Sequence, residues 1–142
     1  MSRSGYSDDI DNWQMIKWRG MVASAIRGNR GQKFLRDLLQ ALDEMPVKEL
    51  IDGKLEDPET GEVCAIGCLG KKRGVNMKEL DPEEPEDVGK VFDISHCLAA
   101  EVVYENDEHS YSETPEDRWK RMRAWVAGNI KALDAAPSEG AE

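Results

Sequence analysis

Apolar residues recur at spacings of three and four along much of the chain, which is the periodicity of an amphipathic helix. The clearest such stripe lies in segment 32–45. It consists of Phe34, Leu35, Leu38, Leu39, Leu42 and Met45. Pro46 follows directly, and a proline cannot donate the hydrogen bond that would continue a helix. The pattern therefore predicts a helix over residues 32–45 with one buried face.

A second helical stripe precedes this one, in residues 11–27. Asp11 is a suitable helix cap, and the apolar positions Trp13, Ile16, Met21 and 23–26 follow it. The run Gly28-Asn29-Arg30-Gly31 then predicts a stop and a turn. We expect Trp13 and Ile16 to lie in the core.

Helix start and stop signals mark further helical segments, two of them short. They are a short buried helix over 64–73 closed by a left-handed Gly74, a short helix over Pro85–Phe92, a helix capped by Asp93 or Ser95 that runs to about Tyr104, and a last helix from Thr114 to about Leu133. The polar run 105–110 between the last two is expected to be a loop. The sequence Thr114-Pro115-Glu116-Asp117 is the strongest of these signals, since it joins a capping hydroxyl, a first-turn proline and two acids.

Segment 50–66 has the least helical character. Asp57–Gly61 contains proline and glycine at positions typical of a turn, with apolar residues on both sides. The segment is compatible with one short β-hairpin, which would have to pack on helices to be stable.

These elements predict a mainly α fold, a single small helical domain of four or five helices over residues 11–134. Residues 1–10 and 135–142 are polar and are expected to be disordered. The predicted core is Trp13, Ile16, Phe34, Leu38, Leu42, Ile66, Leu69, Phe92, Leu98, Val102, Trp119, Met122, Val126 and Ile130.

Charge is distributed unevenly along the 142 residues. The chain has 19 Lys and Arg against 29 Asp and Glu, for a net charge of −10. Residues 1–36 are net basic, residues 37–117 strongly acidic and residues 118–142 net basic. A general affinity for nucleic acid is therefore not expected. The polar N-terminus and the three cysteines indicate a reducing cytosol, with no signal peptide.

Two charged surfaces are candidate interfaces. The basic cluster Arg19, Arg27, Arg30, Lys33 and Arg36, with Trp18 among it, could contact a phosphate backbone or an acidic protein. The acidic stretch Glu83, Glu84, Glu86 and Asp87 could bind a partner protein, and the longer acid run from Glu79 to Asp93 could occupy a nucleic-acid channel by imitating phosphates. For both clusters the alternative is a solvated face, whose ion pairs contribute little.

Candidate catalytic and metal-binding groups are few. Cys64 and Cys68 with His96 and Cys97 have poor spacing for zinc, and three buried, inert cysteines are the expected alternative. The run 105–109 does not have the alternating acids of a calcium loop. The sequence contains no nucleotide-binding or hydrolase motif, so we expect no metal, no cofactor and no catalytic residue.

The rival hypothesis is a small enzyme or ligand-binding protein with a pocket. The pocket would lie between segment Cys64–Gly70 and the loop Glu105–His109. Gly67 and Gly70 would let a ligand approach the backbone, and Glu105, Asp107 and His109 would supply its polar groups.

Three stretches are distinctive in combination. They are Trp18-Arg19-Gly20 with 25–32, Gly61–Gly67, and Tyr104–Glu108 followed by Thr114–Trp119. Together they resemble small proteins of no known activity encoded by bacteriophages and prophages. The resemblance implies a phage genetic context and action in the bacterial cytoplasm. Together with the absent catalytic motifs, the small size and the acidic middle, it favours a non-enzymatic accessory protein that acts by protein–protein contact, for example on a host defence or nucleic-acid enzyme. The oligomeric state is not predicted.

Overall fold

The computed structural model describes residues 12–109 and 112–131, which form six α-helices, one 3-10 helix and no strand. The helices are α1 (Asn12–Arg27), α2 (Asn29–Glu44), α3 (Ala65–Arg73), η1 (Met77–Glu79), α4 (Pro85–Phe92), α5 (His96–Asp107) and α6 (Pro115–Gly128). The mainly α fold class is confirmed, with six helices in place of four or five. The ends predicted to be disordered, 1–10 and 135–142, lie outside the described residues.

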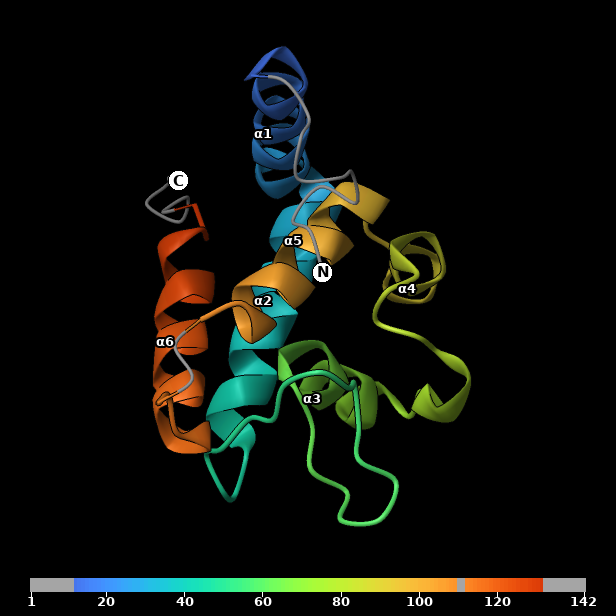
Figure 1. Ribbon diagram of the computed structural model, residues 1–142, viewed down its shortest axis with the longest axis vertical. Helices are drawn as coiled ribbons and strands as arrows, with labels where there is room; N and C mark the ends of the chain where they lie inside the picture. Colours follow the sequence, from blue (N-terminus) through green and yellow to red (C-terminus); the bar gives the residue numbers. More distant parts are fainter. Residues whose placement is uncertain (1–11, 110–111, 132–142) are drawn as a thin grey trace, which may run out of the picture.

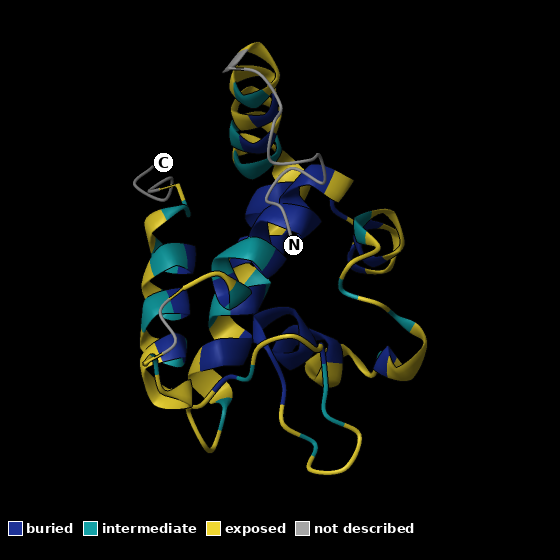
Figure 2. Ribbon diagram, in the orientation of Figure 1, coloured by how far each residue is buried: buried dark blue, intermediate teal, exposed yellow. Residues whose placement is uncertain are grey.

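Helices α2 and α5 occupy the middle of the molecule (Figure 1). Helix α2 packs against α1, α3 and α6, and α5 packs against α1, α3 and α4. The core between them contains ten of the predicted residues, namely Phe34, Leu38, Leu42, Ile66, Leu69, Phe92, Leu98, Val102, Met122 and Val126 (Figure 2). Trp119 and Ile130 are half-buried against this core. The helical periodicity of α2 thus identified its buried face correctly.

The inner face of α1 differs from the prediction. Trp18 and Val22 are buried against α5, whereas Trp13 is 64% exposed and Ile16 is 55% exposed. Apolar residues lie on both sides of this helix, so periodicity alone could not identify the buried side. The prediction that Trp13 and Ile16 belong to the core is wrong.

The break between α1 and α2 is shorter than predicted, because Gly28 is the one non-helical residue between them. A side chain at Gly31 would place its Cβ 1.9 Å from the carbonyl oxygen of Ala25, so this tight junction requires glycine. Buried Gln32 secures it by donating to the carbonyl oxygen of Ile26 (2.7 Å). It also accepts from the amide of Lys131 (2.8 Å), which ties the junction to the end of α6.

The predicted hairpin is reduced to a single antiparallel bridge between Glu56 and Val63. The turn forms as expected, and the amide of Gly61 donates to the carbonyl oxygen of Asp57 (2.8 Å). Backbone hydrogen bonds flank this bridge, from the amide of Asp57 to the carbonyl oxygen of Glu62 (2.8 Å) and from the amide of Cys64 to the carbonyl oxygen of Leu55 (3.1 Å). Farther from the turn, the backbone also bonds to other segments. The amide of Leu50, for example, donates to the carbonyl oxygen of Pro115 (3.0 Å).

Three of the predicted caps form, but two helix ends move, and the cap predicted at Asp11 lies outside the described residues. Gly74 is left-handed (φ 75°), Ser95 accepts from the amide of Leu98, and Thr114 accepts from the amide of Asp117. Helix α5 continues to Asp107, so residues 105–107 are helical and the predicted loop over this run is wrong. Helix α6 ends at Gly128, before the predicted Leu133.

Candidate functional site

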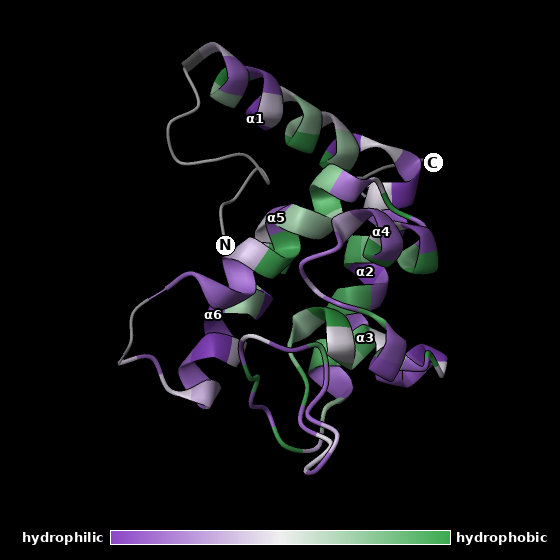
Figure 3. Cartoon of the chain, turned by 45° about the vertical axis from the view of Figure 1, so that its right-hand side comes forward, coloured by the Kyte–Doolittle hydropathy of each residue, from purple (hydrophilic) through white to green (hydrophobic). Residues whose placement is uncertain are grey.

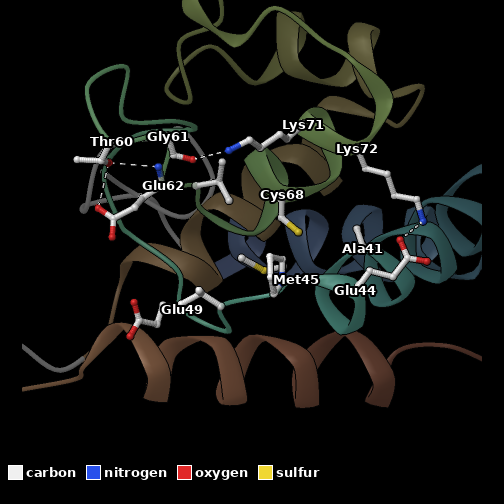
Figure 4. A pocket seen from close by; sticks show the side chains of 13 residues that line it. Ala41, Glu44, Met45, Glu49, Thr60, Gly61, Glu62, Cys68, Lys71 and Lys72 are labelled. Atoms are coloured by element: carbon white, nitrogen blue, oxygen red, sulfur yellow. Dashed lines mark hydrogen bonds and ion pairs between the residues drawn. The ribbon is translucent and has the colours of Figure 1, made fainter.

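One candidate site is a cleft of about 420 Å³ between the end of α2, the outer side of α3 and the turn at residues 60–63 (Figure 4). Its lining residues are Ala41, Glu44, Met45, Pro46, Val47, Glu49, Thr60, Gly61, Glu62, Val63, Cys68, Lys71 and Lys72. The volume lies within the range of small-molecule sites. The sequence did not predict this cleft, because its walls come from three separate segments.

Charged groups of both signs form the rim of the cleft. Lys72 pairs with Glu44 (2.9 Å), and Lys71 donates to the carbonyl oxygen of Gly61 (2.8 Å). Figure 4 shows both interactions at the edge, with the thiol of Cys68 between the walls. The cleft can therefore hold a ligand that has an apolar part and a charged end. The charged end would contact a lysine or a carboxylate at the rim.

The cysteines are poor nucleophiles. Burial raises the pKa of Cys68 to about 11 and that of Cys64 to about 12. Both thiols are therefore neutral at physiological pH, whereas the thiolate is the reactive form. The sulfur of Cys64 accepts a hydrogen bond from the amide of Gly67 (3.4 Å) and so caps α3.

The proposed zinc ligands Cys64, Cys68, His96 and Cys97 do not form a cluster. In the described parts of the chain, no three His, Cys, Asp or Glu side chains are grouped so that they could hold a metal ion. His96 instead lies edge-on to the ring of Trp18, with ring centroids 6.5 Å apart. Cys97 is buried beside Ser95, whose hydroxyl lies 3.2 Å from the sulfur.

Packed atoms occupy the space that Gly67 and Gly70 were expected to open to a ligand. A Cβ on Gly67 would lie 1.8 Å from the carbonyl oxygen of Leu55. A Cβ on Gly70 would lie 2.6 Å from the sulfur of Met77 and 3.1 Å from the ring of Phe92. These two glycines therefore allow close packing around α3.

The segments that were expected to flank a pocket are joined by Asn106, which sequence reasoning missed. Its side-chain oxygen accepts from the amide of Ala65 (3.1 Å), and its amide group donates to the carbonyl oxygen of Ile51 (2.9 Å). Next to it, burial raises the pKa of Asp107. Glu105 is half-buried, and His109 is exposed, 4.0 Å from Glu113.

A second polar cluster lies between α5 and the start of α6. Glu113 accepts two hydrogen bonds from Arg121, 2.6 Å and 3.0 Å long, and these bonds hold the pKa of its carboxyl below the ordinary value. Arg118 is buried, donates to the carbonyl oxygen of Leu50 (2.9 Å) and contacts Glu113 at 3.4 Å. Arg118 thus links α6 to Leu50, and Arg121 links α6 to the end of α5 by donating to the carbonyl oxygen of Glu105 (2.6 Å), so these groups act as structural connections.

The acidic stretch lies at the start of α4. Glu83 and Glu84 precede the helix, Glu86 and Asp87 belong to its first turn, and all four side chains are exposed. Within the described residues, none of the four forms an ion pair. We refer to these four residues as the acidic surface.

The five basic candidates Arg19, Arg27, Arg30, Lys33 and Arg36 are all exposed on α1 and α2. Arg30 pairs with Asp93 (3.2 Å) and Lys33 with Asp37 (3.1 Å). Trp18 is buried and is not part of this surface. In α1 the exposed aromatic ring is that of Trp13, whereas the sequence suggested Trp18.

Comparison with protein-family models, curated proteins and solved structures finds no match to this chain. Among the described helices, none combines the length and the apolar character needed to span a bilayer.

Proposed function

We propose that this chain is a non-enzymatic accessory protein that acts by binding another protein through the acidic surface. The observation that supports this proposal is the set of four exposed carboxylates without an ion pair at the start of α4. The helix behind them is fixed by the buried side chains of Val88 and Phe92. A partner with a basic surface would therefore meet a rigid group of charges.

The surroundings of the acidic surface also favour a protein partner. Val91 is 43% exposed and follows Asp87 by one helical turn, so both lie on the same side of α4. An interface combines such an apolar contact with charged groups at its edge. The partner class we propose is a basic bacterial protein, such as a host defence or nucleic-acid enzyme, in the cytoplasm of a cell carrying a phage.

The chain offers a matched pair of variants for testing this surface. Helices α4 and α6 both begin with Pro-Glu-Asp, at Pro85 and Pro115. Glu86→Lys with Asp87→Lys alters the acidic surface. Glu116→Lys with Asp117→Lys makes the same charge change at the same position of the other helix.

Affinity capture from bacterial lysate compares the two double variants with the wild type. We expect the wild type and the α6 variant to recover the same protein, and the α4 variant to recover about tenfold less. Recovery should also fall as salt screens the contact. Equal recovery by both double variants would place the interface elsewhere, and the absence of any specific protein would reject the proposal.

Binding of a small ligand in the cleft is the second candidate function. It is favoured by the apolar walls and by the lysines and carboxylates at the rim. A library of small carboxylates and amines with apolar groups should then contain compounds that broaden the NMR signals of Val63 and Ala41. Binding that survives Ala41→Phe, a change that fills the cleft, would exclude this site.

A further inference from the structure

Helix α1 exposes apolar side chains on the face opposite its buried one. Trp13, Ile16 and Met21 are 64%, 55% and 44% exposed, whereas Trp18 and Val22 face α5 and are buried. The first turns of the helix project beyond the rest of the molecule, with hydrophobic positions distributed along the helix (Figure 3). Large apolar side chains grouped in this way on a surface mark an interaction site.

The charge around this outer face is of one sign. Residues 12–36 contain six Lys and Arg and no Asp or Glu. Lys17 is one turn from Trp13, and its ammonium lies 5.9 Å from the centre of the tryptophan ring. Arg19 and Arg27 form no ion pair with the described residues, while Arg30 is paired with Asp93 at the far end.

A groove of about 820 Å³ continues the outer face toward α5. Lys17, Gly20, Met21 and Ser24 line its α1 side, and His96 lies across from them. Its lining residues include no Asp or Glu. Open space surrounds the position that a Cβ of Gly20 would take, so a partner can approach the helix backbone there.

We propose that the outer face of α1 and this groove bind an acidic amphipathic helix of a partner protein. Trp13, Ile16 and Met21 would cover its apolar side, as in other helix-in-groove complexes. The cations Lys17 and Arg27, with Arg30 at the end of the groove, would form ion pairs with the carboxylates of the partner helix. This surface is separate from the acidic surface of α4, and the proposal goes beyond the function proposed above.

The apolar centre of the face favours a protein helix over nucleic acid, because nucleic-acid interfaces are more polar and the chain carries a net charge of −10. A dimer in which the α1 helices of two copies pack together is disfavoured, because it would bring the cations of both copies close to one another.

Two synthetic peptides of about 18 residues serve as probes, each an amphipathic helix with leucine on one face. One carries glutamate on its polar face and the other carries lysine. We expect the full-length protein to bind the Leu/Glu peptide with a Kd of about 1–100 µM and to bind the Leu/Lys peptide at least about tenfold more weakly. Fluorescence anisotropy of labelled peptide measures both.

Variants locate the binding site. Trp13→Ala with Ile16→Ala, and separately Lys17→Glu, should each weaken the Leu/Glu peptide about tenfold. The control Lys120→Glu changes an exposed lysine on α6, away from this surface, and should have no effect. Asp93→Asn should strengthen binding, because it frees Arg30, and asparagine tolerates the left-handed backbone at this position (φ 59°).

The proposal would be overturned if the Leu/Glu peptide did not bind, or if the α1 variants bound it as tightly as the wild type. A dimer in sedimentation that Ile16→Glu abolishes, or tighter binding of a single-stranded oligonucleotide at the same residues, would also overturn it. Much tighter peptide binding after Asp8→Asn, Asp9→Asn and Asp11→Asn would make the chain's own N-terminal acids the occupant instead. Affinity capture with the α4 variants is a separate measurement, so failure of this proposal and failure of the proposed function can be told apart.

Discussion

The side chain of Asn106, near the end of α5, caps the start of α3 by accepting a hydrogen bond from the amide of Ala65 at 3.1 Å. The same side chain donates to the carbonyl oxygen of Ile51 at 2.9 Å. One asparagine thus satisfies backbone groups of two segments that are 41 and 55 residues away in the sequence. Unsatisfied buried backbone groups are costly, so this residue should contribute strongly to stability.

Asn106→Ala should lower the free energy of unfolding by about 3 kcal/mol, since it leaves a buried amide and a buried carbonyl without a partner. Urea denaturation followed by circular dichroism measures the change. Asn76→Ala is the control, because Asn76 also accepts from a backbone amide, that of Lys78, but at an exposed site. A control variant as unstable as Asn106→Ala would show that burial does not set the cost.

Two glycine-to-alanine changes should act in opposite directions. Gly67→Ala should destabilise the fold by about 3 kcal/mol, because its Cβ would overlap a backbone oxygen that cannot move independently. Gly20→Ala should stabilise it by about 0.5–1 kcal/mol, because its Cβ enters open space in a helix interior. Denaturation midpoints of the two variants give the comparison, and changes of the same sign would contradict the packing described around α3.

Glu113→Gln should destabilise the protein by about 1 kcal/mol at neutral pH, because it removes the charge from the ion pairs with Arg118 and Arg121. Arg121 holds the pKa of Glu113 below its ordinary value of 4.5. The stabilisation is therefore present above that value and is lost as pH falls through the lower pKa of the folded state. Unfolding free energies measured from neutral to acidic pH should show the two proteins converging. A difference that persists in acid would exclude the charge as its cause.

Asp107→Asn should have the opposite pH dependence. Burial raises the pKa of Asp107 above its ordinary value of 3.8, so the folded protein binds a proton that the unfolded chain releases. The contribution of this carboxyl to the free energy of unfolding therefore falls as the pH rises from 3.8 through the raised pKa of the folded state. The asparagine variant should therefore match the wild type in acid and be more stable at neutral pH. Loss of stability at neutral pH would mean that the hydrogen bonds of the carboxylate outweigh its burial.

Local signals explain which parts of the fold could be predicted. Helices α4 and α6 begin where proline and two acids coincide, and the buried face of α2 follows from its strict apolar spacing. The buried face of α1 could not be predicted, since its apolar residues surround the helix. The roles of Asn106 and Arg118 depend on contacts between distant segments, and no spacing within the sequence encodes them.

The candidate surfaces were predictable to a different extent. Charge runs identify exposed groups well, and the acidic surface and the five basic residues are exposed as expected. The cleft beside Cys68 and the exposed ring of Trp13 depend on how α1, α2 and α3 pack. Sequence patterns do not specify that packing.

Site-specific photo-cross-linking in bacterial cells tests the binding of a partner at the acidic surface most directly. A benzoylphenylalanine replaces Asp87 in one protein and Asp117 in a matched control, both in the first turn of a helix that begins with Pro-Glu. We predict a single discrete adduct with another protein from position 87 and none from position 117. The same adducts from both positions, or no adduct from position 87, would contradict the account.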